Sequence, residues 1–223
     1  MDTEAVAANV ERVRGLIVAA CERSDRSPND VTLIGVTKGF GPDAARAVAA
    51  AGVTDIGENR VQEALPKIAE LCDVQLTWHM IGHLQTNKVK SVLEHFDMIH
   101  SVDSLHLAEA ISTRAREPVP VFIEVNIANE PTKSGFMPAE LPGACKAIRA
   151  LPHLDLRGMM TVAPIARDPE DVRPAFQRLS KEAEMLDLLG LSMGMSDDFE
   201  VAVEEGATHV RLGRAIFGER PAR

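Results

Sequence analysis

Short apolar runs rich in β-branched residues alternate with amphipathic stretches along nearly the whole chain. The first run covers 31–37 and ends abruptly at Lys38, before Gly39 and Gly41 stop the strand. Apolar residues at helical spacing occupy 3–23, which predicts an amphipathic helix ahead of the first strand. A buried strand that delivers one ammonium group at its carboxyl end has the geometry of a site on an α/β sheet or barrel.

The same alternation continues to the end of the chain. The predicted strands are 31–37, 53–56, 75–81, 97–101, 119–126, 154–160, 191–193 and 209–212, and helices are predicted at 43–51, 60–71, 85–95, 104–116, 138–150, 168–189 and 197–205. Eight strands with helical crossovers predict an α/β fold, a single (β/α)8 TIM-type barrel with an extra N-terminal helix. A doubly wound open sheet is the alternative. We expect residues 1–223 to form one domain, because no linker or composition shift divides them.

Composition narrows the classes of function. Lys plus Arg is 24 against Asp plus Glu 33, a net charge of −9, which disfavours a nucleic-acid or acidic-membrane binder. Cys21, Cys72 and Cys145 are far apart without a C-x-x-C pair, as in reduced cytoplasmic proteins. The start lacks a signal-peptide pattern and no apolar run is long enough for a bilayer, so we expect a cytoplasmic protein.

Candidate chemistry gathers at the predicted carboxyl ends of the strands. The Gly194–Ser196 segment follows the seventh strand, and Arg211 to Arg214 closes the eighth with Gly213. Phosphate sites in barrels often use these two loops, and the first strand with Lys38 would be their neighbour. An amine beside a bound phosphate suggests a Schiff base with pyridoxal phosphate. Arg211 could then face the pyridine nitrogen and make the ring a weaker electron sink than a carboxylate partner would.

Each of these features also has a plainer interpretation. A lone lysine at a strand end is more often solvated, although burial among Val, Ile and Met would lower the proton affinity of Lys38. Asp197 with Glu200 three residues later matches a capping box, which predicts only a well-capped helix.

The histidines and methionines carry weaker signals. His79 and His83 are four apart, but Gly82 breaks the helix that such a pair of metal ligands needs, so we expect no metal site. Surface or packing roles are expected for the scattered histidines, which are His95, His100, His106, His153 and His209. The pairs Met159-Met160 and Met193/Met195 are expected to pack in the barrel.

Several motifs, taken together, resemble the pyridoxal-phosphate homeostasis protein family from about residue 31 to residue 218. They are Val36-Thr-Lys38, Ile56-Gly-Glu-Asn59, Val61-Gln-Glu63, Trp78 to Lys88, Lys133-Ser-Gly135, Leu156 to Met160, Leu191 to Asp198 and Val210 to Gly218. The resemblance implies the fold of the alanine racemase amino-terminal barrel. It also implies a protein that holds or delivers pyridoxal 5'-phosphate in vitamin B6 homeostasis, without established turnover.

The resemblance also assigns cofactor-binding roles. Lys38 is the implied Schiff-base lysine, and Arg211 is the residue implied to face the ring nitrogen. Phosphate binding is implied for Ser196, Gly213 and Arg214, mainly through hydroxyl and backbone N–H groups; Asn59, Met160 and Met195 are implied to line the ring. Two departures from the family are Gly39-Phe40, where a more polar pair is frequent, and Arg214, where a small hydroxyl residue is common.

Two other functions compete with cofactor binding. An amino-acid racemase of this fold needs a tyrosine as a second proton-transfer group, and the chain contains no tyrosine, so we expect weak racemisation at best and no catalytic residues. A pure interaction module would bind no cofactor. We expect pyridoxal phosphate as the small-molecule partner, PLP-dependent apo-enzymes as possible recipients, no nucleic acid or membrane partner, and a monomer.

Overall fold

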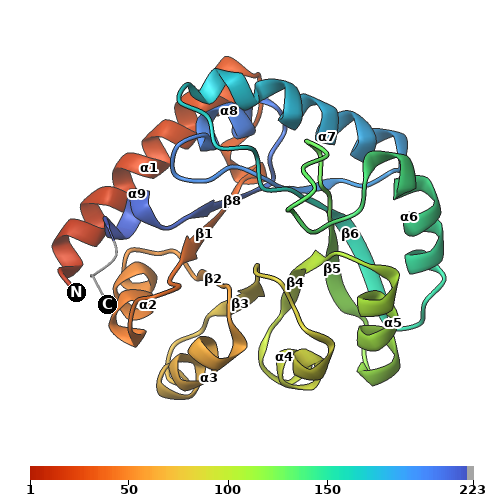
Figure 1. Ribbon diagram of the computed structural model, residues 1–223. Helices are drawn as coiled ribbons and strands as arrows, with labels where there is room; N and C mark the ends of the chain where they lie inside the picture. Colours follow the sequence, from red (N-terminus) through yellow and green to blue (C-terminus); the bar gives the residue numbers. More distant parts are fainter. Residues whose placement is uncertain (220–223) are drawn as a thin grey trace.

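The computed structural model describes residues 1–219, in which parallel strands close into a barrel surrounded by helices (Figure 1). The strands are β1 (Thr32–Val36), β2 (Asp55–Glu58), β3 (Thr77–Met80), β4 (Met98–Val102), β5 (Val119–Glu124), β6 (Leu154–Met160), β7 (Gly190–Ser192) and β8 (His209–Leu212). Each strand pairs with the next, and β8 pairs with β1 to close the ring. The predicted (β/α)8 barrel is therefore confirmed, and the open sheet is excluded.

Helices follow the strands in the predicted order. They are α1 (Thr3–Arg23), α2 (Pro42–Ala50), α3 (Val61–Glu70), α4 (Val89–His95), α5 (Leu105–Arg114), α6 (Leu141–Arg149), α7 (Arg173–Met185), α8 (Phe199–Glu204) and α9 (Arg214–Phe217). Short 3-10 turns are η1 (Pro28–Asp30), η2 (Thr86–Lys88), η3 (Pro138–Glu140) and η4 (Pro169–Val172). Within residues 1–219, no helix combines the length and the apolar character that crossing a membrane requires.

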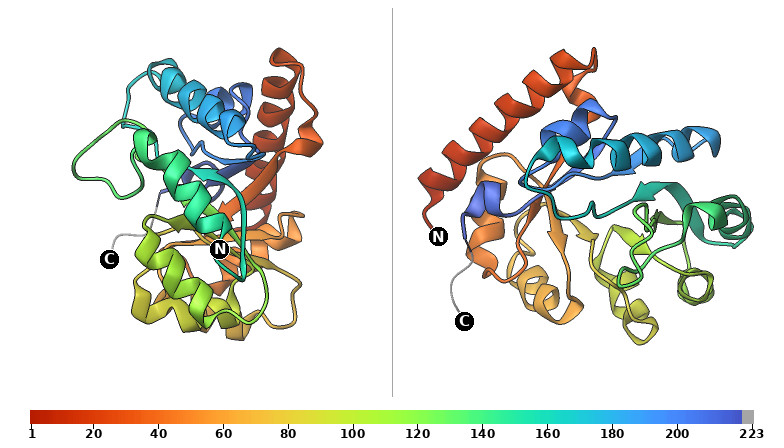
Figure 2. Two further views of the ribbon diagram at one scale, coloured as in Figure 1. Left: turned by 90° about the vertical axis from the view of Figure 1, so that its right-hand side faces the viewer. Right: turned by 45° about the horizontal axis from the view of Figure 1, so that its top comes forward.

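The extra helix α1 is amphipathic, as its sequence predicts. Asp2 caps its start by accepting hydrogen bonds from two backbone N–H groups, and its buried stripe includes Val6, Val10, Val13 and Ile17. Fully burying each of these side chains stabilises the fold by about 1.5–3 kcal/mol. Through this stripe α1 packs against α2, which follows the first strand, and against α8 and α9, which lie before and after the last strand (Figure 2).

Some predicted elements differ from the observed ones. The stretch 168–189 divides into η4 and α7, and Pro174 lies in the first turn of α7, where a missing backbone N–H costs nothing. Helix α7 ends at Met185, before Asp187 takes a left-handed conformation with φ of 52°. The chain after β8 was expected to be a loop but forms the short helix α9.

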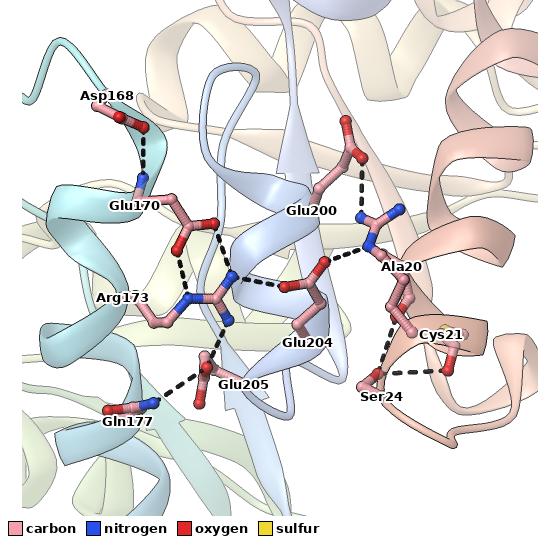
Figure 3. Close-up of polar contacts among 11 residues, drawn as sticks. Ala20, Cys21, Ser24, Asp168, Glu170, Arg173, Gln177, Glu200, Glu204 and Glu205 are labelled. Atoms are coloured by element: carbon pink, nitrogen blue, oxygen red, sulfur yellow. Dashed lines mark hydrogen bonds and ion pairs between the residues drawn. The ribbon is translucent and has the colours of Figure 1, made fainter.

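A network of ion pairs joins α1, η4, α7 and α8 on the outside of the barrel (Figure 3). The Arg173 guanidinium lies 2.6 Å from Glu170, Glu204 and Glu205, and hydrogen bonds to these carboxylates raise its pKa. Arg23 of α1 reaches Glu204 from the other side at 2.5 Å. Burial raises the pKa of Glu204, but hydrogen bonds to both arginines outweigh it and lower the pKa. Helix α8 is thus held from two sides, directly after the loop that follows β7.

The inner and outer sides of the barrel carry different residues. A Cβ on Gly57 would lie 2.9 Å from Ile81 Cδ1 and 3.0 Å from Ile34 Cγ2, so these positions face the interior. A small inner cluster of Met98, Phe122 and Met160 is separate from the main apolar core between strands and helices. Because side chains alternate along a strand, the inner side of β1 carries Ile34 and Val36 and leads on to Lys38.

Candidate functional site

Lys38 lies in the turn that follows β1, half-buried at the carboxyl end of the barrel. Gly39 directly after it has φ of 79°, which lets the chain turn away immediately. Thr37, directly before Lys38, is fully buried. The backbone thus places Lys38 just after β1, and the two-residue period of the strand predicts that it faces the same side as Ile34 and Val36.

Thr37 is held by a buried ion pair that the sequence analysis missed. Its hydroxyl donates to Glu58 Oε1 at 2.5 Å, and Lys67 Nζ donates to Glu58 Oε1 at 2.6 Å and to the Thr37 carbonyl at 2.7 Å. Glu58 is fully buried and Lys67 is 5% exposed. Glu58 Oε2 is buried without a hydrogen-bond partner among residues 1–219. These contacts fix the peptide that leads into Lys38.

The loops after β7 and β8 meet beside β1. Ser196 Oγ accepts a hydrogen bond from the Ala215 backbone N–H at 3.0 Å, which joins the two loops. Gly213 lies against the end of β1, since a Cβ there would be 3.4 Å from the Val36 carbonyl oxygen. Figure 1 shows β8 and β1 side by side. The geometry thus brings the predicted phosphate loops next to the strand that carries Lys38.

Two features of these loops differ from the sequence-based expectation. The capping box of Asp197 and Glu200 is wrong, because α8 begins at Phe199 and Asp197 instead pairs with the exposed Arg214. Glu200 pairs with Arg23 of α1. The Arg214 guanidinium is therefore bonded to Asp197, and the peptide groups of its loop remain as candidate phosphate contacts.

Asp198, next in the chain, closes this loop. Its Oδ1 accepts from the Met195 backbone N–H at 2.6 Å, and burial raises the pKa of its carboxyl group. Gly194 owes its identity to packing rather than to an anion, because its φ is 91° and a Cβ would lie 2.6 Å from Ala202 Cβ of α8. A side chain at Gly194 would push α8 out of place.

Arg211 is a buried cation on the inner side of β8. It is 5% exposed, and its Nη1 donates at 2.7 Å to both the carbonyl and the hydroxyl oxygen of Ser192. Its Nη2 donates to the Thr161 carbonyl at 2.8 Å. Burial lowers the pKa of Arg211 to about 10, against the carboxylates of Asp198 and Glu124, so it stays charged at neutral pH. The guanidinium is thus held at two places, by Ser192 of β7 and by Thr161 directly after β6.

The other predicted ring-lining residues lie at different depths. Asn59 is half-buried just after β2, and its backbone packs so closely on Gly82 that a Cβ there would be 2.4 Å from the Asn59 carbonyl oxygen. Met160 is buried inside the barrel with Met98 and Phe122, as packing predicts. Met195 is half-buried in the loop after β7.

The residues present fit a phosphorylated aldehyde. Among residues 1–219, the Ser196 hydroxyl accepts a bond from Ala215 but donates to no acceptor, so its hydrogen is available for a phosphate oxygen. Both hydrogens of Nη1 and one of Nη2 are engaged, which leaves Nε–H and the second Nη2–H of Arg211 as donors among the described residues. One hydroxyl, a loop without a side chain at Gly213, a buried arginine and an amine are the groups that such a ligand needs.

Three histidines that look scattered in the sequence converge inside the barrel. The rings of His100 and His209 have centroids 5.6 Å apart, and those of His79 and His100 are 5.1 Å apart. His95, His106 and His153 are exposed, as expected. Within the described residues, no group of three or more His, Cys, Asp and Glu side chains could hold a metal ion. The sequence signal that could have indicated this cluster is the two-residue spacing of polar residues along neighbouring strands.

The amino-acid sequence of this chain is similar to those of known proteins. A family model for the alanine racemase N-terminal domain matches residues 1–221. The pyridoxal phosphate homeostasis protein of Pseudomonas aeruginosa is 43% identical over 222 residues, covering 96% of each chain. The protein of the same name from Aquifex aeolicus is 44% identical over 220 residues, covering 95% of this chain and 96% of its own.

Solved structures give the same picture. A protein of unknown function from Bifidobacterium adolescentis matches with a TM-score of 0.90 and 36% identity, over 96% of this chain and 95% of its own. PipY of Synechococcus elongatus, with PLP bound, matches with a TM-score of 0.84 and 36% identity, over 96% of this chain and 100% of its own. An alanine racemase from Corynebacterium glutamicum, 23% identical with a TM-score of 0.74 over 98% of this chain and 61% of its own, shares the fold.

Proposed function

Because the chain belongs to the pyridoxal phosphate homeostasis proteins, within the alanine racemase N-terminal domain family, we propose that it binds pyridoxal 5'-phosphate through Lys38. It holds or delivers this cofactor for vitamin B6 homeostasis and does not turn over a substrate of its own. The observation that carries the proposal is that Lys38, Arg211 and the Ser196–Gly213 loops lie on the adjoining ends of β1, β7 and β8.

Each residue has a defined task in this proposal. When bound, the cofactor would supply an aldehyde, which can condense with a neutral amine and release one water molecule. Lys38 provides that amine, and the Glu58–Lys67 pair fixes the peptide before it. Ser196 donates its hydroxyl hydrogen to the phosphate, with backbone N–H groups of Gly213 and Arg214 beside it.

Arg211 makes the pocket a holder rather than a catalyst. A guanidinium with a pKa of about 10 donates a hydrogen bond to a ring nitrogen but keeps its proton at neutral pH. A bound pyridine nitrogen that accepts this hydrogen bond would stay unprotonated and would withdraw electrons weakly. With no tyrosine in the chain to serve as a second proton-transfer group, racemisation is expected to be negligible. Asn59, Met160 and Met195 complete the proposed ring pocket.

The test is a comparison of Lys38→Ala with Lys90→Ala. Lys90 is an exposed lysine of α4 with an 83% exposed side chain, so it matches the charge change without touching the proposed site. Wild type and Lys90→Ala should show the visible absorbance of an imine, and borohydride should trap the cofactor on Lys38. Equal trapping in Lys38→Ala, or turnover of alanine well above that of free cofactor, would remove the proposal.

The proposal extends to partners and place of action. PLP-dependent apo-enzymes are the recipients we propose, with a cytoplasmic monomer as the delivering species. Mixing the loaded protein with an apo-enzyme across a size barrier and following recovery of enzyme activity tests delivery. Sedimentation at several concentrations tests the monomer.

A further inference from the structure

Hydrogen bonds run without a break through the barrel interior, from Asp55 at the start of β2 to Arg211 of β8. Asp55 Oδ1 lies 3.0 Å from His79 Nε2, and His79 Nδ1 lies 3.0 Å from His100 Nε2. His100 Nδ1 lies 2.8 Å from Ser192 Oγ, which lies 2.7 Å from Arg211 Nη1. Five residues from β2, β3, β4, β7 and β8 thus form one chain of contacts across the barrel.

Four of these five residues are buried, whereas Asp55 is partly exposed to solvent. His79, His100, Ser192 and Arg211 are 0–5% exposed. The Asp55 side chain is 28% exposed and lines a depression of about 390 Å³ among the starts of β1 and β2. The chain therefore connects a solvent-facing carboxylate to the buried guanidinium of the proposed site.

With both rings neutral, the chemistry of the two ends fixes the direction of every bond between them. A guanidinium can only donate, so Ser192 Oγ accepts from Arg211 and its own hydrogen can go to His100 Nδ1. His100 must then carry its proton on Nε2 and donate to His79 Nδ1. His79 in turn carries its proton on Nε2 and donates to Asp55.

The reverse arrangement fails for neutral rings. If His100 donated from Nδ1, its Nε2 would need a proton from His79 Nδ1. Neutral His79 would then place an unprotonated Nε2 against the Asp55 carboxylate, so that two acceptors would face each other at 3.0 Å. Burial and the neighbouring His79 hold the pKa of His100 well below its usual value, which favours the neutral ring.

We propose that Asp55, His79, His100 and Ser192 are positioning residues for Arg211, forming a one-way hydrogen-bond chain that fixes its guanidinium and leaves Nε–H and the second Nη2–H as donors for the cofactor ring. This inference rests on the proposed cofactor site for its functional consequence, but the chain itself is a property of the protein alone. The side chains that face His79 are Asp55 from β2, His100 from β4 and His209 from β8.

The first experiment uses the protein without added cofactor. Two-bond proton–nitrogen NMR correlations of the histidine rings report which nitrogen carries the proton. Near neutral pH, both rings should carry a proton on Nε2 and none on Nδ1. A proton on Nδ1 of either ring would overturn the one-way chain whatever the protein binds.

Asp55 variants separate the chain from simple packing. Asp55→Asn keeps an oxygen acceptor for His79 Nε2–H and should retain the Nε2 tautomers of both rings. Asp55→Leu removes that acceptor and should allow His79 to change tautomer. Identical spectra for the two variants would contradict the assigned direction, because a packing role alone distinguishes size and not acceptor ability.

The second experiment measures the consequence for the cofactor. His100→Phe removes both ring nitrogens at similar volume. His209→Phe is the matched control, since His209 contacts the same rings but its own ring bonds to Thr208, outside the chain of contacts. Loss of a hydrogen bond to a charged group predicts roughly tenfold weaker PLP binding for His100→Phe. Equal affinities in the two variants would refute the positioning role. Failure of wild type to bind PLP would instead refute the proposed function and leave the tautomer result standing.

Discussion

Replacing Lys67 by methionine tests how the buried ion pair behind Lys38 contributes to stability. The substitution keeps an apolar side chain of similar length and removes the ammonium that lies 2.6 Å from Glu58 Oε1 and 2.7 Å from the Thr37 carbonyl. Glu58 is fully buried, and one of its oxygens already lacks a partner among residues 1–219. Breaking a buried pair in this way costs about 3–5 kcal/mol, since the remaining charge is uncompensated.

A second variant separates this loss from the loss of packing. Glu58→Gln combined with Lys67→Met removes the lone charge and keeps an oxygen that accepts from the Thr37 hydroxyl. The double variant should therefore recover more than half of the stability lost by the single one. Lys90→Met, on the exposed face of α4, is the control for the change in residue type.

Urea unfolding followed by circular dichroism measures all of these variants. Lys67→Met should lower the free energy of unfolding by about 3–5 kcal/mol, equivalent to roughly 10 °C in melting temperature for a chain of this size. Lys90→Met should change it by less than about 0.5 kcal/mol. A cost below about 1 kcal/mol for Lys67→Met, or additive losses in the double variant, would refute the account of a coupled buried pair.

Three further predictions concern other parts of the molecule. Burial and its neighbours lower the pKa of His209 to about 4, so the unfolded chain binds a proton that the native protein excludes, and stability should fall as pH drops from about 6.5. At about pH 5 the loss from this group is about 2 kcal/mol, and a His209→Leu variant should show a correspondingly shallower decline in urea midpoint. Arg173→Gln should cost about 1 kcal/mol, and the loss should shrink in concentrated salt; an unchanged loss would speak against ion pairing. Gly194→Ala should cost at least about 2 kcal/mol because of its positive φ and its contact with Ala202, whereas Gly143→Ala, in an open helical position, should stabilise by about 0.5–1 kcal/mol in the same melts.

The sequence pattern was sufficient to predict the barrel because each strand and helix has a recognisable local pattern of apolar residues. Alternation of short β-branched runs with helical periodicity implies parallel strands, and eight such units close the ring. Helix ends were less predictable. The expected capping box failed because Asp197 and Glu200 find partners on α9 and α1, at Arg214 and Arg23, which local sequence does not reveal. That residues 1–223 form one domain stays a prediction.

The residues of the candidate site that lie at strand ends were predictable from the sequence. The buried residues that support them through long-range contacts were not. Lys38 and Arg211 follow from strand position alone, but their roles at a cofactor remain predictions. Glu58 and Lys67 are nine residues apart in sequence and looked like ordinary charges of a strand end and a helix. Only the packing of α3 on β2 turns them into a buried pair, and a single sequence carries no direct signal for that contact.

The polar barrel interior is the feature that links fold to proposed function. Barrels of this type usually fill their interior with layers of Val, Ile and Leu, yet here His79, His100 and His209 occupy inward positions on three strands. Such groups are costly to bury unless each is hydrogen-bonded; the chain from Asp55 to Arg211 supplies these bonds to His79 and His100, and Thr208 supplies one to His209. An apolar interior would leave Arg211 with backbone acceptors alone. A histidine-lined interior instead ties the guanidinium to a carboxylate on the opposite face of the barrel, and under the proposed function a bound ring nitrogen would meet a donor that keeps its proton.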